Sequence, residues 1–171
     1  MENKSSLFLI GFSGSGKSSV GKKLAKVLNY TFIDTDRIIE KKTGKSIDEI
    51  ITQNGEIEFR KIESNVLSEI DFSKKNIVAT GGGLPTIDEN LKIMKKEGSI
   101  IWLEASVDSI FERLFSSNEI RPLLGSNIKK DKIIKLFNIR LSVYNIAETK
   151  IDTNKKELNQ IVKEITKIYG Q

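Results

Sequence analysis

The chain has 171 residues, a formal net charge of +5, and neither cysteine nor histidine. This length is typical of one domain, and it suffices to bury most of the apolar surface without disulfides or a structural metal. The two missing residue types exclude disulfides, thiolate metal sites, cysteine nucleophiles and Ser-His-Asp triads. A general base must therefore be a carboxylate, a lysine or a tyrosine, and a bound metal must be a hard, oxygen-preferring ion such as magnesium.

No stretch approaches the ~20 consecutive apolar residues of a membrane span, and the N-terminal residues do not have the form of a signal peptide. We therefore expect a soluble, cytoplasmic protein that has no membrane partner. The lysines are spread along the chain beside acidic residues, without a basic stripe that carries aromatic residues, so we expect no nucleic-acid partner. We also expect a monomer. Arginine is rare beside lysine, which favours a specific role for each guanidinium, whose planar shape matches a carboxylate or a phosphate. The five arginines are Arg37, Arg60, Arg113, Arg121 and Arg140.

Short apolar runs alternate with amphipathic stretches along the chain. The runs have the composition of buried parallel strands: Ser6–Ile10, Thr31–Ile33, Asn76–Ala79, Ser99–Leu103 and Glu148–Ile151. Helical spacing connects Val20, Leu24, Val27 and Leu28, then Ile57, Lys61, Ser64 and Leu67, then the stretches Asn90–Lys96, Val107–Phe115, Ile133–Tyr144 and Lys156–Ile168. This alternation predicts one α/β domain over residues 1–171, with a doubly wound parallel sheet between two helical layers. The polar stretch Ser116–Lys132 is predicted to be a long exposed connection.

The first predicted strand leads into a glycine-rich stretch, residues 11–18, that fits the pattern G-x-x-x-x-G-K-[ST]. An apolar strand before it and an amphipathic helix after it are the context that this phosphate-binding loop requires. Its glycines let backbone N–H groups turn toward phosphate oxygens, and the helix N-terminus favours negative charge. Lys17 can reach the β- and γ-phosphates, and the Ser18 hydroxyl can ligate magnesium. We expect the chain to bind a nucleoside triphosphate, with ATP as the expected one.

Two carboxylates follow the second predicted strand. The strand Asn76–Ala79 leads into Thr80 and three glycines, so the usual strand-end aspartate of such sites is missing there. Asp34 and Asp36 are the obvious replacements, because two residues of extended chain place them on one face beside the phosphate loop. The alternative is that these residues only cap the helix that begins near Arg37.

In this order and spacing, the motifs resemble those of shikimate kinase. The resemblance spans residues 7 to about 154 and rests on six motifs: the phosphate loop, Asp34-Thr35-Asp36, Gly55-Glu56-Ile57-Glu58-Phe59-Arg60, Gly81-Gly82-Gly83, Arg121-Pro122-Leu123-Leu124, and Arg140 with Tyr144. It implies the fold of the nucleoside monophosphate kinases, a three-layer α/β/α P-loop kinase with a central five-stranded parallel sheet. It also implies a substrate-binding segment at about residues 34–63 and a mobile lid at about residues 116–130. The activity it implies is ATP-dependent phosphorylation of the 3-hydroxyl of shikimate, with Mg²⁺, in aromatic amino-acid biosynthesis.

The resemblance also implies roles for individual residues. Lys17, Asp36 and Arg121 would be catalytic, with Asp36 binding the substrate hydroxyls and Arg121 reaching the nucleotide phosphates from the lid. Arg60, Arg140 and the backbone of Gly81, Gly82 and Gly83 would bind the substrate carboxylate. Ser18 would hold magnesium directly and Asp34 through water. The remaining ATP contacts would come from Gly14, Ser15, Gly16, Ser19, Arg113 stacked on adenine, and Asn154.

Other interpretations stay open on the sequence alone. A small-molecule kinase of the same fold, such as a gluconate kinase, could carry an identical phosphate loop. The glycine triplet and two arginines placed for a ring acid favour shikimate. A non-catalytic nucleotide-binding or nucleic-acid-binding module is disfavoured by the intact Lys17, Ser18 and Asp36. For Arg60, the alternative role is an ion pair with Glu56 or Glu63 on its own helix.

Overall fold

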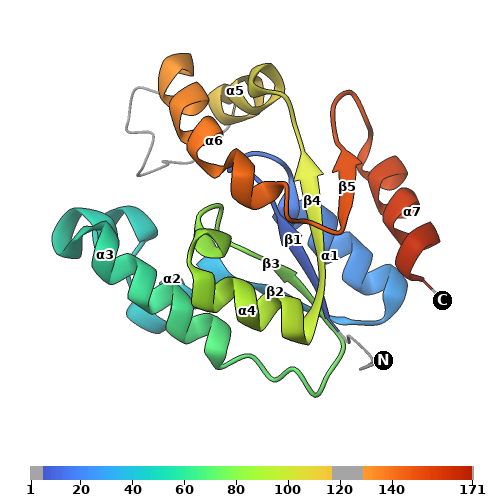
Figure 1. The fold of residues 1–171 in the computed structure, drawn as a ribbon, viewed down its shortest axis with the longest axis horizontal. Helices are drawn as coiled ribbons and strands as arrows, with labels where there is room; N and C mark the ends of the chain where they lie inside the picture. Colours follow the sequence, from blue (N-terminus) through green and yellow to red (C-terminus); the bar gives the residue numbers. More distant parts are fainter. Residues whose placement is uncertain (1–5, 117–128, 171) are drawn as a thin grey trace.

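The computed structural model of the chain describes residues 6–116 and 129–170. At its centre lies a five-stranded sheet in which all paired strands are parallel, in the order β2-β3-β1-β4-β5 (Figure 1). The strands are β1 (Ser6–Ile10), β2 (Thr31–Asp34), β3 (Asn76–Ala79), β4 (Gly98–Glu104) and β5 (Thr149–Asp152). The five predicted strands are therefore confirmed, with ends that differ by one residue in β2, β4 and β5.

Helices connect the strands in the predicted alternation. They are α1 (Lys17–Leu28), α2 (Thr35–Thr43), α3 (Ile47–Ser68), α4 (Asp88–Glu97), α5 (Val107–Ser116), α6 (Lys130–Tyr144) and α7 (Leu158–Tyr169), with a short 3₁₀ turn η1 (Leu84–Thr86). Three predicted boundaries were wrong by two residues or more. Helix α4 starts at Asp88, two residues before the expected Asn90. The last helix starts two residues later than expected, because Glu157 caps it in a reciprocal capping box with Gln160. The expected connection 116–132 is shorter, because α6 already begins at Lys130.

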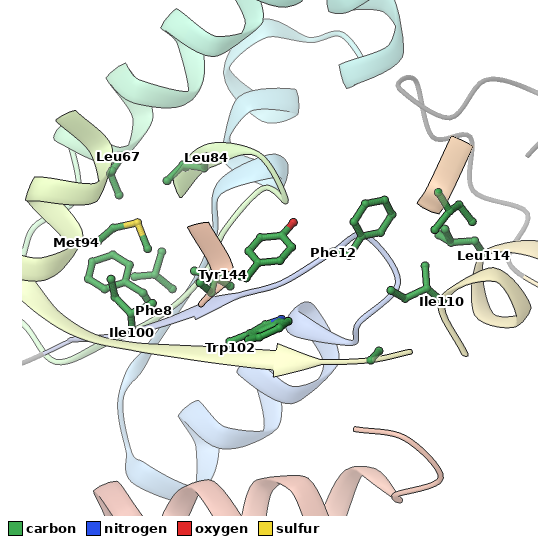
Figure 2. Close-up of a cluster of buried hydrophobic side chains, with 14 of the residues drawn as sticks. Phe8, Phe12, Leu67, Leu84, Met94, Ile100, Trp102, Ile110, Leu114 and Tyr144 are labelled. Carbon is green, nitrogen blue, oxygen red and sulfur yellow. The ribbon is translucent and has the colours of Figure 1, made fainter. Parts of the chain in front are cut away.

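The sheet is covered on both faces, as alternation along β1 requires. Leu7 and Leu9 belong to a buried cluster with residues of α1 and α7. Phe8 and Ile10 point the other way, into a cluster built with residues of α3, α4, α5 and α6 (Figure 2). Successive side chains of a strand point to opposite faces, so β1 anchors both layers. Among the described residues, no helix has the length and apolar character of a membrane span.

A row of aromatic rings runs through the second cluster toward the carboxyl ends of the strands. Trp102 on β4 lies 5.8 Å, centroid to centroid, from Tyr144 at the end of α6 (Figure 2). Phe137 lies 6.4 Å from Tyr144 and 6.0 Å from Phe12, the first residue after Gly11 in the phosphate loop. This packing fixes α6 against the loop.

Helices α2 and α3 form a smaller core of their own, from Ile39, Ile50, Phe59 and Val66. Within α3 the backbone leaves helical geometry at Gly55, where φ is 84° and ψ is 163°. A side chain is disfavoured at such a φ, so glycine permits the break. The expected face through Ile57 was wrong: Ile57 is 78% exposed, and after the break the buried row runs through Phe59, Glu63 and Val66.

Candidate active site

Three neighbouring strands end at one edge of the sheet, and the predicted site residues follow them. The phosphate loop follows β1, Asp34 ends β2, and the glycine triplet follows β3. The register aligns Ala79 with both Asp34 and Leu9, so the three strand ends lie side by side. A cavity of about 790 Å³ opens there, and its lining includes Lys17, Asp36 and the three glycines. Such a crevice beyond the carboxyl ends of the strands is where ligands bind in open α/β sheets.

The phosphate loop has the backbone that its glycines predict. Gly11, Gly14 and Gly16 have φ values of 141°, 84° and 93°, which other residues rarely adopt. Gly16 is the N-cap of α1, and glycine has no side chain to occupy the first N–H groups of the helix. Those groups and the helix dipole therefore form an anion-binding end on the cavity.

Some side chains of the loop line the cavity, and one is buried away from it. Lys17 Nζ donates to the carbonyl oxygens of Gly11 and Phe12, at 2.8 and 2.9 Å. The Ser15 side chain is buried and is not among the residues that line the cavity. Ser18 and Ser19 line it from the first turn of α1. A role of Ser15 toward phosphate would thus involve its backbone.

Asp34 caps α2, as the alternative interpretation of the sequence required, and it also contacts Ser18 of the phosphate loop. Its Oδ1 accepts from Arg37 N at 3.3 Å and caps α2, while its Oδ2 accepts from the Ser18 hydroxyl at 2.7 Å. The expectation that Asp36 continues an extended chain was wrong, because α2 starts at Thr35 and places Asp36 in its first turn. The helical turn still directs Asp36 into the cavity, where it lies against Gly81.

Each glycine of the triplet lies against a different functional group. A Cβ on Gly81 would contact Glu63 Oε1 and lie 2.8 Å from Asp36 Oδ1. On Gly82 it would lie 3.1 Å from Arg140 Nη1, and on Gly83 it would lie 2.5 Å from Arg60 Nη2. Any side chain here would displace the arginines or the carboxylates, which gives three consecutive glycines a physical reason.

Arg60 makes both of the ion pairs that the sequence offered as its alternative role. Its Nη2 lies 2.8 Å from Glu56 Oε1, and its Nη1 bonds Glu63 Oε2. The Glu56 carboxylate is half exposed, whereas the Glu63 side chain is buried. Burial raises the pKa of the Glu63 carboxyl to about 7; the Arg60 and Arg140 guanidinium groups oppose the rise and the Asp36 carboxylate adds to it. The guanidinium nonetheless faces the cavity, so the pairing and a binding role are compatible.

Arg140 reaches the same cavity from α6. It is 5% exposed, and its guanidinium lies 5.7 Å from the centre of the Phe12 ring. One turn later, the Tyr144 hydroxyl donates to Gly82 O at 2.7 Å. Burial raises the pKa of Tyr144 to about 12, so the hydroxyl keeps its proton and its donor role.

Arg113 and Asn154 lie together at the other side of the phosphate loop. Arg113 donates to Gly14 O at 3.3 Å and to Thr153 O at 2.8 Å. Asn154 Oδ1 accepts from Ser106 N at 2.9 Å. The predicted adenine-side residues are thus adjacent to one another. Arg121 and most of the predicted lid lie outside the described residues.

Three buried polar residues that support the site were not predicted as site residues. Thr35 Oγ1 accepts from Gly81 N at 3.0 Å and ties α2 to the triplet. Tyr144 and Glu63 hold Gly82 and Arg60. A signal for Glu63 is present in the sequence, since it lies between Phe59 and Val66 on one helical face, where an acidic residue is unusual.

A parallel sheet with this strand order, and a phosphate loop between its first strand and helix, defines a P-loop nucleotide-binding domain. Comparison with known proteins agrees with this class and narrows it. Residues 13–169 match the family model described as shikimate kinase. A shikimate kinase from a Sulfurihydrogenibium species is 44% identical over 163 residues, which cover 95% of this chain and 96% of that protein. The chain belongs to the shikimate kinase family.

Further relatives agree with this assignment. The shikimate kinase of Persephonella marina is 43% identical over 159 residues, or 93% of this chain and 95% of that protein. Among solved structures, shikimate kinase from Acinetobacter baumannii in complex with shikimate matches with a TM-score of 0.91 and 34% identity, covering 98% of this chain and 94% of that one. A gluconokinase from Sinorhizobium meliloti matches with a TM-score of 0.55 and 20% identity, which shows a shared fold only.

Proposed function

We propose that the protein transfers the γ-phosphoryl group of ATP to the 3-hydroxyl of shikimate, forming shikimate 3-phosphate and ADP in aromatic amino-acid biosynthesis. One observation carries the proposal: a phosphate loop, two arginines and an acidic side chain, Asp36, face one cavity. A phosphate donor, an acid group and a hydroxyl group can therefore be bound side by side. Family membership and a relative solved with shikimate support the choice of substrate.

In this proposal, Arg60 and Arg140 bind the carboxylate of the substrate. A guanidinium matches a carboxylate with two parallel hydrogen bonds, which a lysine does not provide. Both groups lie against the glycine triplet, whose backbone can approach the ligand closely because no Cβ intervenes. The acid end of the substrate is thereby fixed at one end of the cavity.

Asp36 accepts a hydrogen bond from the reacting hydroxyl and aligns its oxygen with the γ-phosphorus. Phosphoryl transfer depends mainly on alignment and charge neutralisation. One positioned carboxylate is therefore enough to orient the attacking hydroxyl oxygen. The proton of the hydroxyl moves toward Asp36 as the bond to phosphorus forms.

The phosphate end is bound by the N–H groups of the loop, with Gly14, Ser15, Gly16 and Ser19 as the contributing residues. Lys17 exchanges its two carbonyl partners for phosphate oxygens when the nucleotide binds.

Arg113 and Asn154 bind the adenine, and Arg121 folds over the phosphates from a lid at about residues 116–130. The substrate segment is about residues 34–63. The protein acts as a monomer in the cytoplasm.

Ser18 and Asp34 fit a magnesium ion. Their hydroxyl and carboxylate oxygens are 2.7 Å apart, and both are the hard donors that this ion takes. When bound, the ion neutralises charge on the β- and γ-phosphates. Ser18 would ligate it directly and Asp34 through a water molecule, and the remaining ligands would be phosphates and water.

A coupled assay of ADP release tests the function. The protein with Mg²⁺ and ATP should release ADP rapidly with shikimate, and slowly with gluconate or with no acceptor. Faster turnover with gluconate would assign a different sugar-acid substrate. Tight, steeply salt-dependent binding of RNA or DNA without any turnover would indicate a binding module instead.

A further inference from the structure

A buried carboxyl group lies at the acid-binding end of the cavity, and the proposed phosphoryl transfer does not use it. Glu63 belongs to α3, and its side chain is 1% exposed. Its Oε2 accepts from Arg60, while its Oε1 has no hydrogen-bond partner among the described residues. That second oxygen is directed at Gly81, on the same side as the Asp36 carboxylate.

Groups that favour the ionised form of Glu63 and groups that favour its neutral form both surround this side chain. Arg60 and the exposed Glu56 are its neighbours on α3, Asp36 faces it from α2, and Arg140 and Tyr144 belong to α6. Within residues 6–116 and 129–170, the two guanidinium groups are what stabilises the ionised form of Glu63, and Arg60 already shares its charge with Glu56. Burial and the Asp36 carboxylate favour the neutral form.

We propose that Glu63 takes up a proton from solvent when the acid substrate binds and releases it when the site empties. This inference rests on the proposed function, because it requires a carboxylate to bind Arg60 and Arg140. The ligand brings a further negative charge to the same guanidinium groups and displaces water from the cavity. Both changes disfavour a second anion at Glu63. The balance is one solvent proton and one substrate anion bound, with Glu63 converted from carboxylate to carboxylic acid.

The neutral acid also gives the unpartnered oxygen a function. A protonated carboxyl carries an O–H donor that an ionised one lacks. Through Oε1 this donor can be shared toward the neighbouring carboxylate, while Oε2 still accepts from Arg60. Arg60 then directs more of its charge to the substrate.

The pH range of the effect follows from the direction of the shift. Burial places the pKa of Glu63 at about 7 in the empty site, so the group is mostly ionised at pH ~8 and mostly neutral at pH ~6. Binding of the acid raises this pKa further. Uptake at pH ~8 is then about 0.4 proton for a rise of one unit and about 0.8 for two. The dissociation constant for shikimate stays constant below pH ~6 and increases as the pH rises through ~7, by up to about tenfold per unit of rise in the pKa.

Calorimetry of shikimate binding to the intact protein tests this. Titrations at pH ~8 in HEPES and in Tris differ in buffer ionisation enthalpy, so uptake appears as a difference in observed enthalpy. We expect that difference in the wild-type protein, and none in Glu63→Gln, which is permanently neutral at this position. The pH dependence of the dissociation constant should likewise disappear in Glu63→Gln. Glu56→Gln is the matched control: it also contacts Arg60 but is exposed, so uptake should persist.

Each outcome has one meaning. Equal enthalpies in the two buffers, with a dissociation constant that is constant from pH ~6.5 to ~8.5, overturn the inference while leaving the proposed function intact. Uptake that persists in Glu63→Gln also overturns it, because another group would then carry the proton. Absence of shikimate binding overturns the proposed function and this inference with it. If Glu63→Gln does not fold, the wild-type buffer comparison still decides whether a proton is taken up, and Asp36→Asn decides where: removal of its charge should shift the uptake to lower pH.

Discussion

Replacing Gly83 by alanine should weaken shikimate binding without destabilising the fold. Gly83 has φ −105° and ψ −6°, which alanine adopts readily, so the backbone carries no strain. The new Cβ would lie 2.5 Å from Arg60 Nη2, and ordinary contact begins at about 3.4 Å. The guanidinium would therefore move by about 0.9 Å, at the end of a flexible side chain.

A displacement of that size should remove one charged hydrogen bond to the substrate acid. Such a bond is worth roughly 1.5–3 kcal/mol, so the dissociation constant should rise about 10- to 150-fold. Alanine restricts the unfolded chain by about 0.4–1 kcal/mol, which offsets the cost of displacing Arg60 and keeps the free energy of unfolding close to that of the wild type.

Calorimetry measures the dissociation constant for shikimate, and urea unfolding measures the free energy of unfolding. Gly82→Ala is the matched control, because its Cβ would lie 3.1 Å from Arg140 Nη1 and require a movement of only about 0.3 Å. Its affinity should fall by a few fold at most. Normal binding of shikimate by Gly83→Ala would refute the reasoning. A larger loss of shikimate affinity in Gly82→Ala than in Gly83→Ala would refute it as well.

Four further predictions concern the remaining machinery. Lys17→Met should abolish turnover and leave the circular dichroism spectrum unchanged, since it removes charge at the mouth of the cavity; near-normal turnover would exclude the phosphate-loop role. Asp36→Asn should lower kcat more than ATP affinity, whereas Asp34→Asn should raise the magnesium requirement; exchanged phenotypes would reverse the two roles. Arg121→Ala should lower kcat by about 10²–10³ with shikimate affinity within a few fold, and lysine should restore it only partly; normal kcat or simple loss of shikimate binding would exclude a catalytic role. Tyr144→Phe should cost about 1–2 kcal/mol of unfolding free energy in urea, because the Gly82 carbonyl loses its donor; an unchanged value would mean that the bond contributes nothing.

Features encoded within a few neighbouring residues could be predicted from the sequence. The phosphate loop is one of these, because its glycines determine the backbone of that same segment. The five strands are another, since buried parallel strands need only short apolar runs. The glycine triplet could be recognised as unusual, but its neighbours come from α2, α3 and α6. Local sequence does not connect these helices, and only the family resemblance grouped Arg60 and Arg140 with the triplet.

Errors arose where two local signals competed or where the contacts are distant in sequence. Asp34 and Asp36 fit both a strand end and a helix start, and the capping bond to Arg37 N decides for the helix. Glu63 was recognised as a partner of Arg60, but its position beside Gly81 depends on β3 and could not be foreseen. Gly55 interrupts the helical period, so the buried face after it shifts.

The aromatic packing between β4 and α6 places an intrinsic fluorophore close to the candidate site. Trp102 is the single tryptophan of the chain, so its fluorescence comes from one known position. That indole lies 5.8 Å from the Tyr144 ring, whose hydroxyl bonds the Gly82 carbonyl 2.7 Å away. Only one side chain thus separates the fluorophore from the backbone of the triplet, while the core shields it from solvent and from quenchers. Emission intensity and lifetime should therefore follow occupancy of the acid-binding end of the cavity, and rapid mixing of the unlabelled protein with ligand can time that event.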